Sequence, residues 1–293
     1  MSTEAKKQIA FVLYPGLTPL DLIGPLQALS AAPRVDPTYE VMVVAETPDT
    51  VVSDSIISLG PSHTFDHAPS PFAIVVPGGG DPTLRAAGHK PLIDYVTEAG
   101  ARAEIVMSVC TGAIILATAG FLKGRRATTH WAYVDVLENL GVEVVRARWV
   151  EDDKYLTTAG VSAGIDGGIY LAQRLLGDEV AKLIQLGMQY EPDPPLGPID
   201  WDPAITQAVR PIWRPPLEDI LAAHPHLNRR GAFRRSGHSE RRSAVPATTD
   251  GRRERHRRRC RGDVRHTELV IEAAAREDVL TRWALRTGVP CRS

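Results

Sequence analysis

Apolar runs and helical patterns alternate along the first two hundred residues. Runs typical of buried strands cover residues 9–14, 39–45, 72–76 and 104–109, and further strands are expected at 126–130 and within 142–160, around a turn at Asp152-Asp153. Helical patterns cover residues 18–32, 90–103, 111–120, 131–141, 162–177 and 178–190, and residues 51–61 suggest a hairpin or short edge pair. This alternation is typical of an α/β protein whose helices connect the strands of a mostly parallel sheet.

One domain over residues 6–215 accounts for these patterns, and the charge changes sign beyond it. Residues 1–228 hold 16 basic and 27 acidic side chains, a net charge of −11, whereas residues 229–293 hold 18 arginines and 8 acids, a net charge of +10. The acidic body is unsuited to nucleic acid. Residues 216–293 are expected to form an arginine-rich tail that is disordered, because large apolar residues are too few to offset its ordering entropy. The basic tail is compatible with nucleic-acid binding, but arginine without lysine also fits an aberrant tail translated past a frameshift, which is the interpretation we favour.

The N-terminal residues and the cysteines indicate the compartment. The polar start MSTEAKKQ and the short apolar run after it do not form a signal peptide or a membrane span, so we expect a cytoplasmic protein. Three cysteines do not make a disulfide framework. Cys110 is therefore expected to be a free thiol.

Cys110 lies where the strand predicted at 104–109 turns into the helix predicted at 111–120. Small residues stand two positions on either side of it, Ser108 and Gly112, which is the layout of a nucleophile elbow. The N–H groups at the start of this helix would face the sulfur and favour the thiolate. The alternative is a cysteine that only packs in the core.

Three loops should meet at one edge of the sheet, because ligands of open α/β sheets bind beyond the carboxyl ends of the strands. These loops are the turn after Tyr14, the PGGG run at 77–80 and the elbow at Cys110. We expect a free amide of Gly79 or Gly80 to stabilise negative charge on a substrate, together with the amides at the start of the next helix.

A thiolate in covalent catalysis needs a proton donor and acceptor, and three residues are candidates. Asp21 follows the first strand and should lie at the same edge of the sheet as Cys110, although its spacing from Thr18 also fits a capping box. His130 ends the strand predicted at 126–130 and is as well explained by a hydrogen bond to the backbone. Asp166, in the first turn of a helix, is expected to be structural.

We expect neither a metal nor a cofactor. The nine histidines show no metal-ligand spacing with acids or cysteines. The PGGG run lacks the G-x-G-x-x-G spacing of a dinucleotide site.

Five spaced motifs resemble the DJ-1/PfpI superfamily and, within it, the isocyanide hydratases. They are FVLYPGLTPLDLIGPLQAL, VVPGGG, SVCTGA, GFLKGRRATTHWAY and TTAGVSAGID, and the resemblance spans residues 8–200. It implies a flavodoxin-like three-layer α/β sandwich of the class I glutamine amidotransferase-like type, with a mostly parallel sheet and a nucleophile elbow. It also implies a homodimer and a lyase that adds water to an uncharged isonitrile, giving an N-substituted formamide without a cofactor.

The resemblance assigns roles to three residues. Cys110 matches the family's nucleophile, which would form a thioimidate, Thr111 is the threonine beside it, and Asp21 matches the general acid and base. Thr111 stands where the protease-like members carry histidine, which argues against a Cys-His peptidase. Two alternatives stay open: a glyoxalase- or deglycase-type thiol enzyme acting on reactive aldehydes, and a non-catalytic redox or ligand sensor.

Overall fold

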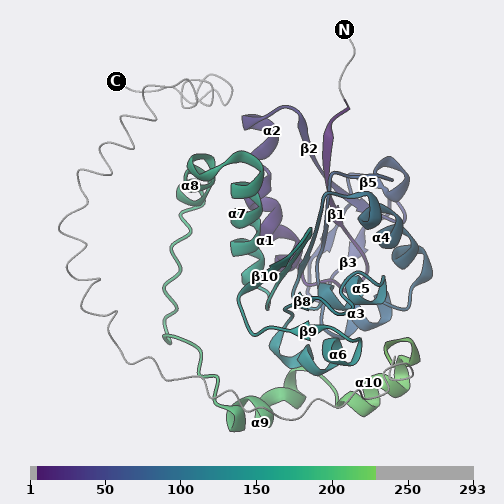
Figure 1. Cartoon of the computed structure of the whole chain (residues 1–293). Coiled ribbons are helices and arrows are strands. Elements are labelled where there is room, and N and C mark those ends of the chain that lie inside the picture. Colours follow the sequence, from purple (N-terminus) through teal and green to yellow (C-terminus); the bar gives the residue numbers. More distant parts are fainter. Residues whose placement is uncertain (1–4, 229–293) are drawn as a thin grey trace, which may run out of the picture. The chain divides into compact units, whose positions relative to one another are not determined.

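The computed structural model describes residues 5–228, and these lie in the first of the two compact units of the chain. Their centre is a seven-stranded sheet with the order β10-β11-β7-β6-β1-β2-β5 (Figure 1). Its strands are β1 (Lys7–Val12), β2 (Tyr39–Ala45), β5 (His63–Thr64), β6 (Ala73–Val76), β7 (Ile105–Val109), β10 (Trp149–Asp152) and β11 (Tyr155–Thr158). Neighbouring strands are parallel except β10 and β11, which are antiparallel. The predicted mostly parallel sheet is confirmed.

Two small ladders lie beside this sheet. The predicted hairpin is the antiparallel pair β3 (Val51–Val52) and β4 (Ser58–Leu59), and β8 (Arg126–Ala127) pairs in parallel with β9 (Glu143–Val144). The strand predicted at 126–130 is thus wrong beyond its first two residues. The Thr128 amide donates to the side chain of Thr157 over 2.9 Å, and the strand ladder ends there.

Helices cover both faces of the sheet (Figure 1). On one side lie α1 (Pro19–Leu29), α2 (Ala32–Val35), α7 (Ala163–Leu176) and α8 (Asp178–Gly187); on the other lie α3 (Asp81–Ala86), α4 (Lys90–Arg102), α5 (Gly112–Thr118) and α6 (Val134–Asn139). The result is the expected three-layer sandwich. All residues of β6 and β7 are buried, as central parallel strands covered on both faces require.

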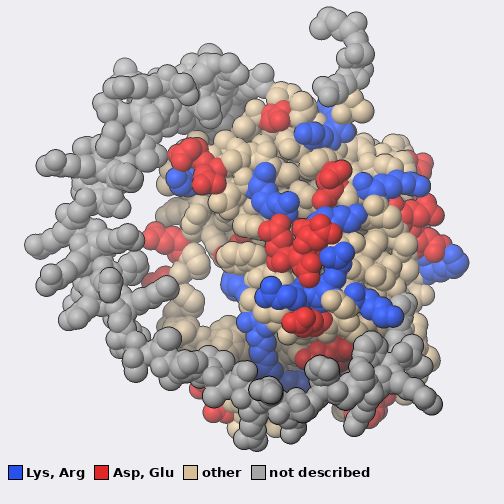
Figure 2. All heavy atoms as spheres, in the orientation of Figure 1, with Lys and Arg blue, Asp and Glu red and all other residues tan. Residues whose placement is uncertain are grey.

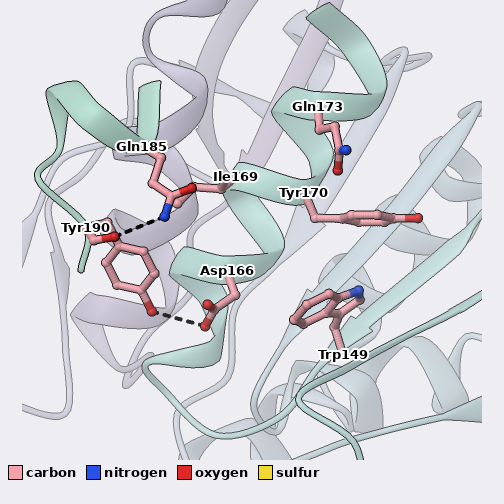
Figure 3. Close-up of a pocket in the computed structure, with 7 residues that line it drawn as sticks. All are labelled: Trp149, Asp166, Ile169, Tyr170, Gln173, Gln185 and Tyr190. Atoms are coloured by element: carbon pink, nitrogen blue, oxygen red, sulfur yellow. Dashed lines mark hydrogen bonds between the residues drawn. The ribbon is translucent and has the colours of Figure 1, made fainter. Parts of the chain in front are cut away.

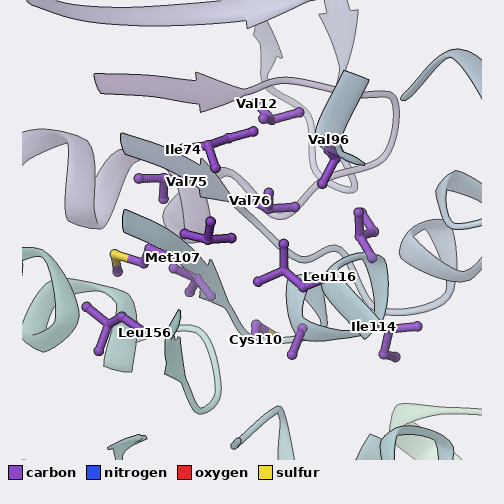
Figure 4. Close-up of a cluster of buried hydrophobic side chains, with 14 of the residues drawn as sticks. Val12, Ile74, Val75, Val76, Val96, Met107, Cys110, Ile114, Leu116 and Leu156 are labelled. Atoms are coloured by element: carbon purple, nitrogen blue, oxygen red, sulfur yellow. The ribbon is translucent and has the colours of Figure 1, made fainter. Parts of the chain in front are cut away.

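The core surrounds the carboxyl ends of β6 and β7. Figure 4 shows Cys110 in the same cluster of buried side chains as Val76, Met107 and Leu116. On the other face α1 and α7 pack closely, and a Cβ atom on Gly168 would lie 2.6 Å from the Cα atom of Pro25. The glycines of the SAGIDGG stretch therefore allow this helix contact.

A C-terminal arm, residues 201–228, packs against the sandwich. It contains α9 (Pro203–Trp213), α10 (Leu217–Ala223) and the 3-10 helix η3 (Pro225–Leu227). Ile220 and Leu227 are buried, and the Asn139 side-chain amide donates to the Leu227 carbonyl over 2.8 Å. The described fold thus continues past the boundary predicted at residue 215, which the prolines of residues 192–198 obscure in the sequence because they interrupt the helical pattern before the arm. The predicted tail at 229–293 lies outside the described residues.

The surface of this part of the chain carries charges of both signs. Acidic and basic side chains are intermixed on the face shown in Figure 2, and some are paired, as in Arg125–Asp152 and Lys182–Glu179. Within residues 5–228 the structure has no helix whose length and hydropathy would let it cross a bilayer.

Candidate active site

Cys110 occupies a strained turn between β7 and α5, as the elbow motif predicts. Its φ angle is +56°, in the left-handed region, which costs free energy and persists only where neighbouring contacts hold the backbone in place. The Cys110 amide donates to the carbonyls of Thr158 and Ala159 over 3.1 and 2.9 Å. The Thr129 hydroxyl donates to the Cys110 carbonyl over 2.9 Å. Two residues after Cys110 the turn needs a glycine, because a Cβ atom on Gly112 would overlap the Val76 carbonyl oxygen.

The sulfur is buried, with Cys110 only 4% exposed, and two backbone amides donate to it. These amides belong to Thr111 and Val161, and both lower the pKa of the thiol. Burial and the neighbouring Asp21 carboxyl outweigh them and raise the pKa of Cys110 well above its ordinary value of 9.0. The expectation that the helix start makes Cys110 a thiolate is therefore wrong: the two amides do not offset the loss of water.

Asp21, on α1, has no exposed surface and lies beside Cys110. Its Oδ2 atom accepts a hydrogen bond from the Gly78 amide over 3.0 Å. Its Oδ1 atom is buried and has no N–H or O–H donor among residues 5–228, while the Cys110 thiol interacts with the same carboxyl group. The side chain of Thr18 caps nothing and donates to Asp54 instead, so Asp21 does not belong to a capping box.

Burial raises the pKa of Asp21 from 3.8 to about 7. Hydrogen bonds from Gly78 and Cys110 act in the opposite direction, and the charge of Asp54 adds to the increase. Burial is the largest of these effects. The carboxyl and the thiol interact, so they titrate as a pair. As the pH rises through about 7, this pair loses one of its two protons.

The Thr111 hydroxyl connects the PGGG loop to the elbow. Its Oγ1 atom accepts hydrogen bonds from the Gly79 and Gly80 amides over 3.0 and 3.2 Å and lies 2.8 Å from the Thr83 hydroxyl. The expectation that Gly79 or Gly80 offers a free amide to substrate is therefore wrong. The donors at the sulfur are Thr111 and Val161. Val161 follows β11, the parallel neighbour of β7, so the TTAGVSAGID motif is the signal that points to it.

His130 and Asp166 are not placed as acid–base partners of Cys110. The His130 Nδ1 atom accepts a hydrogen bond from the Ala132 amide over 3.3 Å and so caps the 3-10 helix η2 (Trp131–Tyr133). Burial lowers the pKa of His130 to about 4, so its ring is neutral at pH 7. Asp166 pairs with Arg148 and accepts from the Tyr190 hydroxyl over 3.1 Å, in a separate shallow pocket (Figure 3).

That pocket is lined by aromatic and amide side chains, by Ile169 and by the carboxylate of Asp166. In Figure 3 the rings of Trp149 and Tyr170 face each other, and the Tyr190 hydroxyl points to Asp166. Within residues 5–228 no group of three or more His, Cys, Asp or Glu side chains is placed to hold a metal ion.

The sandwich and the strained cysteine define an α/β protein of the nucleophile-elbow type. The model of the DJ-1/PfpI family matches residues 7–173, and the chain belongs to this family.

Relatives within the family include enzymes. An isonitrile hydratase of Pseudomonas putida is 41% identical over 194 residues, which cover 64% of this chain and 80% of the relative. A deglycase of Pyrococcus horikoshii is 30% identical over 122 residues, 41% of this chain and 73% of that one. The crystal structure of a ThiJ/PfpI family protein from Pseudomonas syringae superposes with a TM-score of 0.66 at 32% identity, covering 76% of this chain and 90% of that one.

Proposed function

We propose that the protein is an isonitrile hydratase, a lyase that converts an isonitrile and water into an N-substituted formamide. The observation that carries the proposal is the buried pair of the Cys110 thiol and the Asp21 carboxyl, with the Thr111 and Val161 amides donating to the sulfur. Its similarity to the Pseudomonas putida hydratase supports the same reaction.

The first step forms a carbon–sulfur bond. Above pH about 7 the pair holds one proton, and its transfer from the Cys110 thiol to Asp21 creates the nucleophile when substrate is present. The sulfur attacks the terminal carbon of R–N≡C, and Asp21 delivers the proton to that carbon. The product is a thioimidate, R–N=CH–S–Cys110, and Asp21 is left as a carboxylate.

The second step adds water to the thioimidate carbon. Asp21 accepts a proton from the attacking water and passes it to the substrate nitrogen, so that the adduct is R–NH–CH(OH)–S–Cys110 and Asp21 is again a carboxylate. Collapse of this adduct forms the carbonyl group, breaks the carbon–sulfur bond and returns a proton to the Cys110–Asp21 pair. The formamide leaves, and substrate, water and side chains balance the reaction without a cofactor.

Thr111, Gly79 and Gly80 support this chemistry in different ways. The Thr111 amide stabilises negative charge on the sulfur as it leaves. We propose that Gly79 and Gly80 act indirectly, because their amides hold the Thr111 hydroxyl and thereby fix the start of α5.

The two rival functions are supported less well. The deglycase relative keeps a thiol enzyme for reactive aldehydes as the second candidate. A redox sensor would need an accessible thiolate, whereas Cys110 is 4% exposed and its pKa is raised.

Purified protein assayed with phenyl isocyanide and with methylglyoxal separates these functions. We expect N-phenylformamide from wild type, with no detectable turnover by Cys110→Ala and turnover lowered by about 10²–10⁴ in Asp21→Asn. Cys260→Ala, which changes another cysteine of the chain, is the matched control and should behave as wild type. Full hydratase turnover by Cys110→Ala would rule out covalent catalysis, and turnover of methylglyoxal alone would favour the second candidate.

We further propose that the enzyme is a cytoplasmic homodimer, as the family resemblance implies. Sedimentation equilibrium should give twice the mass of the 31.9 kDa chain. A monomer at micromolar concentration would contradict this.

A further inference from the structure

An aromatic group lies next to Cys110 and has no part in the proposed chemistry. We use this term for His130, Trp131, Tyr133 and Trp213. The His130 ring centroid lies 5.7, 6.0 and 6.3 Å from those of Trp131, Tyr133 and Trp213, respectively. These rings come from η2 and from the end of α9, which are far apart in the sequence.

Two members of the aromatic group cover the two loops that flank the sulfur. On one side, a Cβ atom on Gly160 would lie 3.0 Å from the His130 ring, and the next residue, Val161, donates its amide to the Cys110 sulfur. On the other side, a Cβ atom on Gly80 would lie 3.5 Å from the Tyr133 hydroxyl. Both loops that flank the sulfur therefore have a ring of the aromatic group against them.

The chemistry of these rings suits an apolar substituent. His130 is neutral at pH 7 because burial lowers its pKa to about 4. The Tyr133 hydroxyl is occupied by a hydrogen bond to Asp81 over 2.6 Å. Trp213 is the outermost ring and is 61% exposed, so its indole face is available to a ligand.

The residue after Trp213 fixes the end of α9 against η2. Arg214 is only 4% exposed, donates to the Ala132 carbonyl and pairs with Asp135. It also donates to the Pro215 carbonyl over 2.7 Å, and its guanidinium lies 5.9 Å from the centroid of the Tyr133 ring. Loss of the hydrogen bonds and the ion pair of a buried arginine is unfavourable, so Arg214 holds Trp213 beside His130.

We propose that His130, Tyr133 and Trp213 form the subsite for the R group of the isonitrile, and that this subsite selects aryl over short alkyl substituents. The inference rests on the proposed function for the identity of the substrate. Trp213 is the specificity-determining residue, because it is the exposed member of the group.

Trp213→Ala tests the subsite with two substrates that differ only in R. For phenyl isocyanide we expect kcat/KM to fall about tenfold, which is the usual effect of removing an apolar contact to substrate, whereas for methyl isocyanide it should change by less than about twofold. Trp213→Phe should recover most of the loss. Trp201→Ala is the matched control, because Trp201 is a 53% exposed tryptophan of the same C-terminal arm outside the aromatic group. An equal loss for both substrates, or no loss for either, would overturn the proposal.

A second readout does not depend on hydratase turnover. The rates at which N-phenylmaleimide and N-methylmaleimide alkylate Cys110, followed by mass spectrometry of its peptide, report the same preference. Trp213→Ala should lower the phenyl-to-methyl rate ratio several-fold relative to wild type and Trp201→Ala. If wild type hydrates neither isonitrile, the proposed function fails, and this ratio alone then decides the subsite. An unchanged ratio refutes it.

Discussion

Asp21 is a carboxyl group without exposed surface, so folding the chain around it is unfavourable whenever it is ionised. The folded protein holds the proton up to pH about 7, whereas the ordinary pKa of the carboxyl is 3.8. The unfavourable contribution therefore grows from pH about 4 to about 7 and is constant above that. The catalytic role proposed for Asp21 thus comes at the expense of stability.

Asp21→Asn should stabilise the protein most at alkaline pH. The pKa difference limits the gain in the free energy of unfolding to about 4 kcal/mol at pH 8 and to under about 2 kcal/mol at pH 5. Urea unfolding at the two pH values measures the difference. Asp193→Asn changes an exposed aspartate and serves as the control. A gain that does not depend on pH would show that the carboxyl is not held protonated.

At the residue scale the sequence predicted the cysteine, the threonine and the aspartate that the structure brings together. The strand-to-helix turn fixes the backbone of the cysteine and the threonine, and the first loop fixes that of the aspartate. Both are local features that the sequence shows. The protonation of Cys110 was not predictable, because it depends on how completely Asp21 and the core exclude water. The binding of both Gly79 and Gly80 by one hydroxyl was missed for a similar reason, since it depends on a side-chain rotamer.

The contact of α1 with α7 decides how the first loop is held, because Asp21 lies on α1. Both helices were predictable, because each is a long run of helix-compatible residues between predicted strands or breaks. The short elements were missed: α3 has six residues and β5 has two, too few for a period to show. Residues 128–130 resemble a strand in composition, but His130 caps η2 instead.

Gly168→Ala tests the α1–α7 contact. Its Cβ atom would lie 2.6 Å from backbone of Pro25, so a helix has to move, and we expect a loss of about 1–3 kcal/mol in the free energy of unfolding. Gly187→Ala is the matched control, because it also lies in a helix, on α8, and meets no atom within 4 Å. Thermal unfolding should show a gain or no change for the control. Equal behaviour of the two variants would contradict a close helix contact.

The whole sandwich, with the anchors of the C-terminal arm, lies within residues 5–228. We therefore expect a chain that ends at Asn228 to keep kcat/KM within about twofold and Tm within about 3 °C of the full chain. Its net charge would fall from −1 to −11, which ion-exchange elution should reveal. An insoluble or inactive product would show that the remaining residues are needed for folding.

Ending the chain at residue 215, the boundary predicted from the sequence, should instead destabilise it, because Ile220 and Leu227 are buried.

The anchoring of Arg214 on Ala132 and Asp135 has a consequence for how the protein is made. The arginine leaves the ribosome 79 and 82 residues after Asp135 and Ala132, or roughly 4–16 s later at about 5–20 residues per second. During that interval the nascent polypeptide carries the elbow cysteine and the η2 rings without Trp213 beside them. The proposed subsite for the R group is therefore complete only after α9 docks against η2.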